Sequence, residues 1–163
     1  MKVALLHQVR VTNMAKPSLK RSPTRTQMHT IKGTGIPSIG LMIKRVYEPP
    51  SEGDGFRLLV DRLWPRGLSK AKVAVDLWLR DVAPSAALRT WFNHDPVRWT
   101  EFRRRYIAEL DCAPTVVDQL LTQARQGRLT LLYGAQHETC NNAVVLKQYL
   151  SQRLKRRSSK ETR

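Results

Sequence analysis

Cysteine and long hydrophobic stretches are scarce in this chain of 163 residues. The two cysteines, Cys112 and Cys140, match neither the paired Cys/His spacing of a zinc site nor a disulfide framework. No hydrophobic run approaches the roughly 18 residues that span a bilayer, and Val3–Leu6 is too short for the apolar region of a signal peptide. We therefore expect a soluble cytoplasmic protein with no metal site and no membrane partner.

The familiar motifs of cofactor binding and hydrolysis are also missing. The sequence contains no GxGxxG, no GxxxxGK followed by Ser or Thr, no HExxH and no GxSxG. It has no internal repeat of solenoid length. We therefore expect no cofactor.

Acidic and aromatic residues are absent from the first 41 positions. Residues 1–41 hold seven Lys and Arg residues, whereas residues 42–152 hold 16 basic residues, 12 acidic residues and all 11 aromatic residues. Residues 153–163 add six basic residues and one acid. We expect a disordered basic extension at 1–41 that is dispensable for folding, an α/β domain at 42–154 and a solvated basic tail at 155–163.

The basic extension has three interpretations. Translation could start at Met42, where the patterned sequence begins, and this interpretation is favoured. The segment could instead be an organelle transit peptide, although residues 34–42 lack an amphipathic face. As a third option it could be an arm that binds nucleic-acid phosphates without sequence preference.

Hydrophobic patterning predicts alternating strands and helices. Two strands are expected from short apolar runs, at Phe56–Leu63 and Leu129–Tyr133, and one from alternation at Ile43–Glu48. Alternation from Val73 to Leu79 favours a fourth extended segment over a helix. Four helices are expected, at Ala86–Phe92 after a Ser85 cap, from Asp95-Pro96 to Leu110, at Pro114–Gln126 before a left-handed stop at Gly127, and at Asn141–Leu154. This order predicts a single layered α/β domain with a small, mostly parallel sheet flanked by helices.

Two polar loops follow the most hydrophobic predicted strands. Residues 61–67 follow one strand and residues 133–141 follow another. In open α/β sheets ligands bind beyond the carboxyl ends of the strands, so these loops should converge on a pocket if the strands are neighbours. The candidate ligand-binding residues are Arg62, Trp64, Arg66, Tyr133, His137, Glu138, Cys140 and Asn141.

The first loop offers guanidinium groups for an anion. Arg62 and Arg66, with Pro65 stiffening the backbone between them, could grip a phosphate or carboxylate. Alternatively, Arg62 could pair with Asp61 or Asp81 and only shape the loop. A core position with the indole N–H bonded to backbone is favoured for Trp64 over a stacking role. We expect Arg66 and Asn141 to face one shared polar cavity.

The second loop carries a thiol near a helix N-terminus. That position favours a thiolate at Cys140, and His137 could act as its base. An inert, partly buried thiol is the favoured interpretation. His94 and Asp95 are secondary candidates for acid-base roles, although Asp95 also suits a helix cap.

The strings DRLWPRG at 61–67, FNHDP at 92–96 and LTLLYGA at 129–135 resemble the domain of unknown function 488 family, in its YeaO-like branch. The resemblance covers about residues 42–154 and implies a compact α/β domain, a start at Met42 and no established activity. More distant members are similar to a Glu…Cys-His-Arg pattern around 138–142. Cys140 falls on that cysteine, whereas Asn141 and Asn142 replace the His and Arg. YeaO-like members often resemble His-Asn at 140–141, so Cys140 departs from the nearer pattern, and this departure weakens a nucleophilic role for its thiol.

Three functions fit these observations. The first is a pocket for a small anionic or nucleotide-type ligand at the strand ends, with or without catalysis. The second is weak, non-specific nucleic-acid binding through the basic tails, and the third is a non-catalytic interaction module. Because residues 42–152 have a net charge of only +4, from 16 basic and 12 acidic residues, the sequence favours the pocket over a nucleic-acid surface within the domain.

Overall fold

The computed structural model describes residues 40–161, so residues 1–39 of the extension expected at 1–41 and the last two residues lie outside this range. The described chain forms one four-stranded parallel sheet in the order β1-β4-β2-β3. Its strands are β1 (Leu41–Arg45), β2 (Phe56–Leu59), β3 (Leu77–Trp78) and β4 (Leu129–Tyr133). Its helices are α1 (Lys70–Val73), α2 (Ala86–Phe92), α3 (Trp99–Asp111), α4 (Pro114–Gln126) and α5 (Asn142–Glu161), with short 3-10 helices at Glu52–Asp54, Arg80–Val82 and Pro96–Arg98. The predicted α/β class with a parallel sheet is confirmed.

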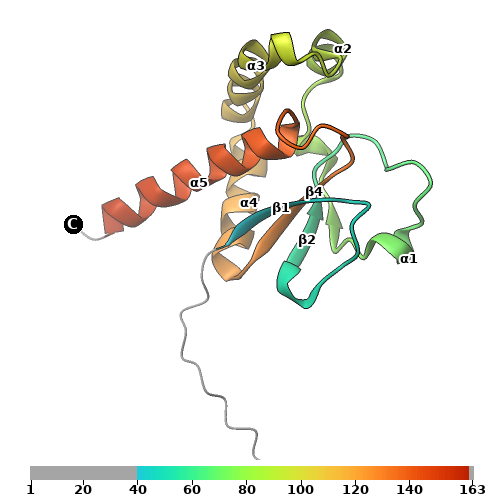
Figure 1. Ribbon diagram of the computed structural model, residues 1–163. Coiled ribbons are helices and arrows are strands. Elements are labelled where there is room, and N and C mark those ends of the chain that lie inside the picture. Colours follow the sequence, from blue (N-terminus) through green and yellow to red (C-terminus); the bar gives the residue numbers. More distant parts are fainter. Residues whose placement is uncertain (1–39, 162–163) are drawn as a thin grey trace, which may run out of the picture. The chain divides into compact units, whose positions relative to one another are not determined.

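Both faces of the sheet are covered, which explains the continuous apolar runs in its central strands. Leu58 and Leu131 belong to the large core cluster formed with α2, α3, α4 and α5. Leu59 and Leu132 point the other way, into a smaller cluster with Val46 and Val73. Figure 1 shows α4 and α5 beside the sheet, with α1 at the other side. Every residue of β4 is buried, and its predicted bounds are confirmed.

The first strand begins and ends earlier than predicted. The Leu129 amide donates to the Gly40 carbonyl, so pairing with β4 starts before Ile43. The chain turns after Arg45, because the Glu48 amide donates to the Arg45 carbonyl and the Glu48 side chain accepts from the Arg45 amide. Leu41 is buried in β1 although it lies in the segment expected to be dispensable.

The segment from Val73 to Leu79 is not one extended run. Val73 ends α1, and Ala74 then adopts a left-handed conformation with φ of 46° that reverses the chain. Only Leu77 and Trp78 pair with β2. The predicted extended segment therefore spans the end of a helix, α1, and a short strand, β3.

The predicted helix starts at Ser85 and Asp95 are confirmed, whereas the predicted stop at Gly127 is not. The Ser85 hydroxyl accepts from the Leu88 amide and the Asp95 carboxylate from the Val97 amide, as expected of N-caps. Gly127 has φ of 163°, so it is extended and the predicted left-handed stop is wrong. Helix α5 continues to Glu161, beyond the Leu154 end that was expected. None of the helices within residues 40–161 has the length and apolarity to cross a membrane.

Candidate functional site

A cavity of about 400 Å³ opens where β2 and β4 end. Its wall comes from the loop after β2, the loop after β4, the start of α5, and the α2–α3 region. The lining residues are Tyr47, Asp61, Arg62, Leu63, Trp64, Pro65, Arg66, Pro84, Arg89, Phe92, His94, Phe102, Gly134, Ala135, Asn141 and Asn142. The two loops therefore converge as the sequence predicts, at the edge where parallel α/β sheets bind ligands.

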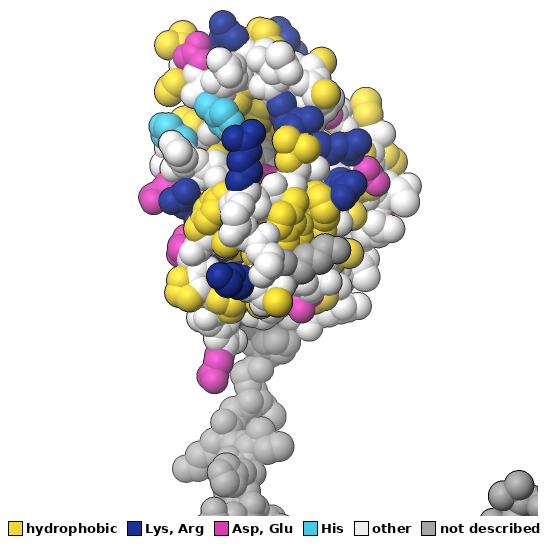
Figure 2. All heavy atoms as spheres, turned by 90° about the vertical axis from the view of Figure 1, so that its right-hand side faces the viewer, with side chains coloured by type: hydrophobic (Ala, Val, Ile, Leu, Met, Phe, Trp, Pro, Cys, Tyr) yellow, Lys and Arg dark blue, Asp and Glu magenta, His cyan; other side chains and the backbone are white. Residues whose placement is uncertain are grey.

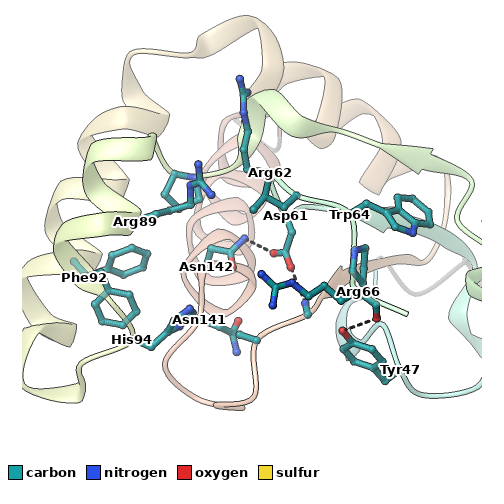
Figure 3. Close-up of a pocket in the computed structure, with 16 residues that line it drawn as sticks. Tyr47, Asp61, Arg62, Trp64, Arg66, Arg89, Phe92, His94, Asn141 and Asn142 are labelled. Carbon is teal, nitrogen blue, oxygen red and sulfur yellow. Dashed lines mark hydrogen bonds between the residues drawn. The ribbon is translucent and has the colours of Figure 1, made fainter. Parts of the chain in front are cut away.

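Asp61 joins the two loops. One carboxylate oxygen accepts from the Gly134 amide at 2.7 Å and the other from the Asn142 side chain at 3.1 Å. The side-chain amide of Asn142 also donates to the Val60 carbonyl at 3.1 Å. A Cβ at position 134 would lie 3.2 Å from the Asp61 carboxylate, so glycine allows this close approach. Figure 3 shows Asp61 and Asn142 linked in the middle of the cavity.

Burial is the main influence on the Asp61 carboxyl group. It raises the pKa of Asp61 above the ordinary value, while the hydrogen bonds from Gly134 and Asn142 and the charges of His94 and Arg89 act in the opposite direction. Asp61 is the sole carboxylate in the lining, which also holds three arginines and a histidine. The cavity is therefore basic overall, with one firmly held acceptor at its centre.

Arg66 and Arg89 bring positive charge to the cavity from different elements. Within the described part of the chain, no hydrogen bond or ion pair engages the Arg66 guanidinium. The Nε of Arg89 is the one buried side-chain nitrogen or oxygen in residues 40–161 that has no hydrogen-bond partner. Figure 3 shows Arg89 and Arg66 reaching the cavity from opposite sides, with the Arg66 side chain extending toward Asp61 and Asn142 in its middle. Both guanidinium groups can therefore bind an anionic ligand without first breaking an ion pair.

The other two candidates in the first loop already have protein partners. Arg62 forms an exposed ion pair with Asp81 at 3.3 Å. The Trp64 indole N–H donates to the Leu68 carbonyl at 2.7 Å, and its ring makes an edge contact with Trp78, with centroids 5.2 Å apart. Both side chains line the cavity. Each nevertheless makes the contact that a structural role requires, Arg62 with Asp81 and Trp64 with the Leu68 carbonyl.

Asn141 lines the cavity, but its side chain forms hydrogen bonds with the surrounding backbone. It is 2% exposed. Its oxygen accepts from the Val144 amide at 3.1 Å and so caps α5, while its Nδ2 donates to the carbonyls of His137 and Glu138 at 2.9 Å each. Asn141 therefore shapes the loop, and its polar atoms are already engaged.

The remaining candidates of the second loop do not reach the cavity. Tyr133, His137, Glu138 and Cys140 are absent from its lining. The His137 Nδ1 accepts from the Cys140 amide at 3.1 Å, so this nitrogen is engaged by backbone. The geometry favours the inert interpretation of Cys140, because its thiol does not face the cavity.

His94 and Asp95, the secondary candidates, separate in the structure. Asn93 and His94 are both left-handed, with φ of 44° and 56°, and this turn places His94 in the cavity wall. Asp95 caps the 3-10 helix at Pro96–Arg98 and forms an ion pair with Arg98 at 3.3 Å. Asp95 is thus structural, whereas His94 belongs to the site.

The candidate residues did not include six polar or aromatic wall residues: Tyr47, Asp61, Arg89, Phe92, Phe102 and Asn142. Asp61 was considered only as a possible partner of Arg62. Arg89 lies inside a short amphipathic helix, where an arginine is usually solvated, and no local pattern distinguishes it. Asn142 follows a loop in which Asn141 was the more obvious candidate. Tyr47 was placed in a predicted strand, and the early end of β1 moves it to the cavity rim.

A second hollow of about 880 Å³ lies between the β2–β3 edge and α4. Its lining contains no Lys, Arg or His, and its one charged residue is Asp118. Among the described residues no group of three or more His, Cys, Asp or Glu side chains could hold a metal ion. The cavity at the strand ends is therefore the stronger candidate for a functional site.

The fold and the cavity define a small parallel α/β protein with a basic hollow at the carboxyl ends of its central strands. The chain belongs to the inactive DUF488-N3 subclade, whose family model matches residues 40–163. The resemblance to the domain of unknown function 488 family, in its YeaO-like branch, is thereby confirmed.

Curated relatives cover most of the folded domain. The uncharacterized protein YeaO of Escherichia coli is 42% identical over 112 residues, which are 69% of this chain and 97% of that protein. The uncharacterized protein Rv3073c of Mycobacterium tuberculosis is 39% identical over 111 residues, covering 68% of this chain and 93% of the relative. Mb3100c of Mycobacterium bovis, also uncharacterized, gives the same values. No solved structure matches the chain significantly.

Proposed function

We propose that this protein binds a small organic anion in the basic cavity, without making or breaking a covalent bond. The observation that carries the proposal is the pair Arg66 and Arg89. Their guanidinium groups reach one cavity from separate elements, and the buried Nε of Arg89 has no partner in the described structure. A buried donor without an acceptor is costly, so an acceptor on a ligand would stabilise it.

The chemistry of the wall supports an anion over a neutral or cationic ligand. Arginine binds carboxylates and phosphates through two parallel hydrogen bonds, and such charge-assisted bonds are stronger than neutral ones. His94 adds a third donor in the same wall. The carboxylate of Asp61 offsets at most one of these positive charges, and the three arginines in the lining leave the wall basic overall.

A binding role is favoured over catalysis for two reasons. The subclade to which the chain belongs is described as inactive. The thiol of Cys140, the nucleophile considered from the sequence, lies outside the cavity. Catalysis would need a nucleophile or an acid-base pair aimed into the site.

Thermal unfolding with inorganic phosphate or sulfate tests the proposal. At constant ionic strength, either anion should raise the melting temperature of the full chain above its value in chloride, because a ligand that binds only the native state stabilises it. Arg66→Ala and Arg89→Gln should each abolish this increase. Arg66→Ala alone should leave the melting temperature without phosphate within a few degrees, since the side chain is exposed and forms no ion pair.

Arg125→Ala is the matched control, because it removes the same charge from an exposed position of α4 outside the cavity. It should keep the response to phosphate. Equal stabilisation by phosphate and chloride, or a full phosphate response in both cavity variants, would contradict the proposal. Marked destabilisation by Arg66→Ala with an intact phosphate response would identify Arg66 as structural.

A further inference from the structure

Two large apolar side chains are exposed at the rim of the basic cavity. Tyr47 is 46% exposed and Leu63 is 70% exposed, and both belong to the lining. They are two of five large hydrophobic residues in the described chain with this degree of exposure. On the face shown in Figure 2, Lys and Arg side chains lie around a group of hydrophobic ones, and the acidic side chains lie mostly toward the edges. Such a combination suits a ligand with an anionic group and an apolar body.

The side chain of Tyr47 makes two contacts with the rest of the protein before any ligand binds. Its hydroxyl donates to the Arg66 carbonyl at 3.4 Å, and the Arg45 guanidinium lies 5.5 Å from the ring centroid. Figure 3 shows Tyr47 next to Arg66 at the same side of the cavity. An oriented aromatic ring beside a guanidinium group can stack a flat heterocycle while the charge holds its phosphate.

Asp61 adds a requirement for a hydrogen-bond donor on the ligand. Each of its oxygens accepts one hydrogen bond from the protein and retains a second acceptor site. The carboxylate lines the cavity between the apolar rim and the Arg89 side of the wall. A sugar hydroxyl would suit this acceptor, whereas sulfate or an ionised carboxylate offers it no donor.

The volume limits the size of the ligand. A cavity of about 400 Å³ lies near the lower end of the range for sites that enclose small organic ligands, about 300–1,000 Å³. One ring system, one sugar and one phosphate suit this space, and a dinucleotide would extend well outside it.

We propose that the cavity binds a nucleoside monophosphate, with its phosphate at Arg66 and Arg89, its sugar hydroxyls toward Asp61 and its base against Tyr47 and Leu63. This assignment rests on the proposed anion site and names the ligand class for it. It also assigns the rim residue Tyr47 a role in specificity, because the base is the part of the ligand that inorganic phosphate lacks.

Isothermal titration of the full chain with graded probes tests this assignment. The probes are inorganic phosphate, ribose 5-phosphate, adenosine monophosphate, cytidine monophosphate and adenosine, all at one ionic strength. A nucleoside monophosphate should bind about tenfold or more tightly than phosphate, since stacking of one base on an aromatic side chain is worth a factor of this order. Ribose 5-phosphate should be intermediate, and adenosine should bind weakly.

Tyr47→Ala should remove most of the gain that the base provides, so that its affinity for a nucleoside monophosphate approaches its own affinity for ribose 5-phosphate. Leu63→Ala is a second rim variant with the same expected direction. Val97→Ala is the matched control, because Val97 is an apolar side chain that is 92% exposed outside the cavity. These three substitutions alter exposed side chains, so the variants should fold.

The outcomes separate the two proposals. If phosphate binds and both nucleotides bind no more tightly than ribose 5-phosphate, the nucleotide assignment is wrong and the anion site stands. If the gain from the base persists in Tyr47→Ala and Leu63→Ala, the base does not lie at the rim and the assignment is also wrong. If neither phosphate nor any nucleotide binds, the anion site itself fails. Adenosine binding as tightly as its monophosphate would likewise overturn the role of the arginines.

Discussion

Asp61 is the residue on which the geometry of the cavity depends most. It directly follows the buried run of β2, and its carboxylate bonds both the backbone after β4 and the first residue of α5. These bonds fix the distance between the two loops that carry the wall. Arg66 lies five positions further along the same loop, so its placement depends on this connection as well. A binding site built from loops needs such a fixed residue to hold its shape.

Asp61→Asn should therefore destabilise the protein by about 1–3 kcal/mol, because an amide nitrogen must face either the Gly134 amide or the Asn142 side chain, which are both donors. Chemical denaturation at pH 7 measures this loss. Asp81→Asn is the control, since the Asp81 side chain is exposed and forms only a surface ion pair. Equal stability of Asp61→Asn and the unmodified chain would show that the carboxylate does not connect the loops.

Residue types near strand ends were enough to predict part of this site. Arg66 could be found because a Pro-stiffened loop with an arginine follows a strongly apolar strand, and that position is local in sequence. Arg89 could not be found, because its role comes from the packing of α2 across the sheet end, which no local pattern encodes. The same limit applies to Cys140. Its position near the start of α5 was predicted from the sequence, but the sequence does not show whether its thiol faces the cavity.

At the scale of elements, the connection between β1 and β2 is held by hydrogen bonds to three strands. Asp54, in the 3-10 helix Glu52–Asp54, accepts from Lys44 of β1 at 3.0 Å and from Arg57 of β2. Its backbone carbonyl accepts from the Thr130 hydroxyl of β4 at 2.6 Å. One turn thus joins three neighbouring strands at the end of the sheet opposite the cavity.

This turn should make stability depend on acid. Burial alone would raise the pKa of Asp54, but hydrogen bonds from Ser51 and Lys44 and the charge of Arg57 hold it well below the ordinary value of 3.8. Because the pKa is lower in the folded state, the contribution of Asp54 is complete above pH 3.8 and is lost as the pH falls further. Asp54→Asn should cost roughly 2–4 kcal/mol at pH 7, since it leaves two cations without their carboxylate.

Urea denaturation of both chains between pH 7 and pH 2 measures this dependence. The difference between Asp54→Asn and the unmodified chain should stay constant from pH 7 to about pH 5 and shrink below about pH 4. Glu52→Gln serves as the control, because Glu52 is exposed in the same turn. A difference that is already small at pH 7 would mean that the buried pairs contribute little.

Elements could be predicted from sequence where one pattern covers the whole element. The strand Leu129–Tyr133 is a continuous apolar run between a glycine and a polar loop, so its bounds follow directly. The pair Leu77–Trp78 is too short for any period, and it is a strand only because β2 lies beside it. Gly127 suggested a left-handed stop by residue type alone, whereas tertiary packing leads the chain out of α4 in an extended conformation.

For the whole molecule, the location of charge separates two kinds of binding. Residues 42–152 carry a net charge of only +4, from 16 basic and 12 acidic residues, so the basic cavity is a local feature. The excess lies near the two ends of the chain, and all seven basic residues of the first 41 fall within residues 1–34. Charge on the ends can attract polyanions, but phosphate contacts alone do not read a base sequence. Ligand binding in the cavity and nucleic-acid binding should therefore be independent properties.

Nucleic-acid binding, where it is observed, should depend on residues 1–34 and be strongly sensitive to salt. The full chain should bind random duplex DNA with an affinity that falls steeply as salt increases, because each phosphate contact releases a counterion. A chain that begins at Gly35 retains Gly40 and Leu41, which pair with β4, and lacks seven positive charges. Its binding should be weaker, and the slope of log affinity against log salt should be smaller by at most about 6, the value for seven lost contacts.

Fluorescence anisotropy over a salt series measures both slopes, and the melting temperature of the shorter chain checks that it folds. Adenosine monophosphate at saturating concentration provides the internal control: it should leave duplex binding by the full chain unchanged, because the cavity and the basic end are different sites. Tight, sequence-selective binding by the chain that begins at Gly35 would place nucleic-acid recognition in the folded domain. Competition between the nucleotide and the duplex would contradict this independence, because one ligand changes the affinity of another only where their sites overlap or are coupled.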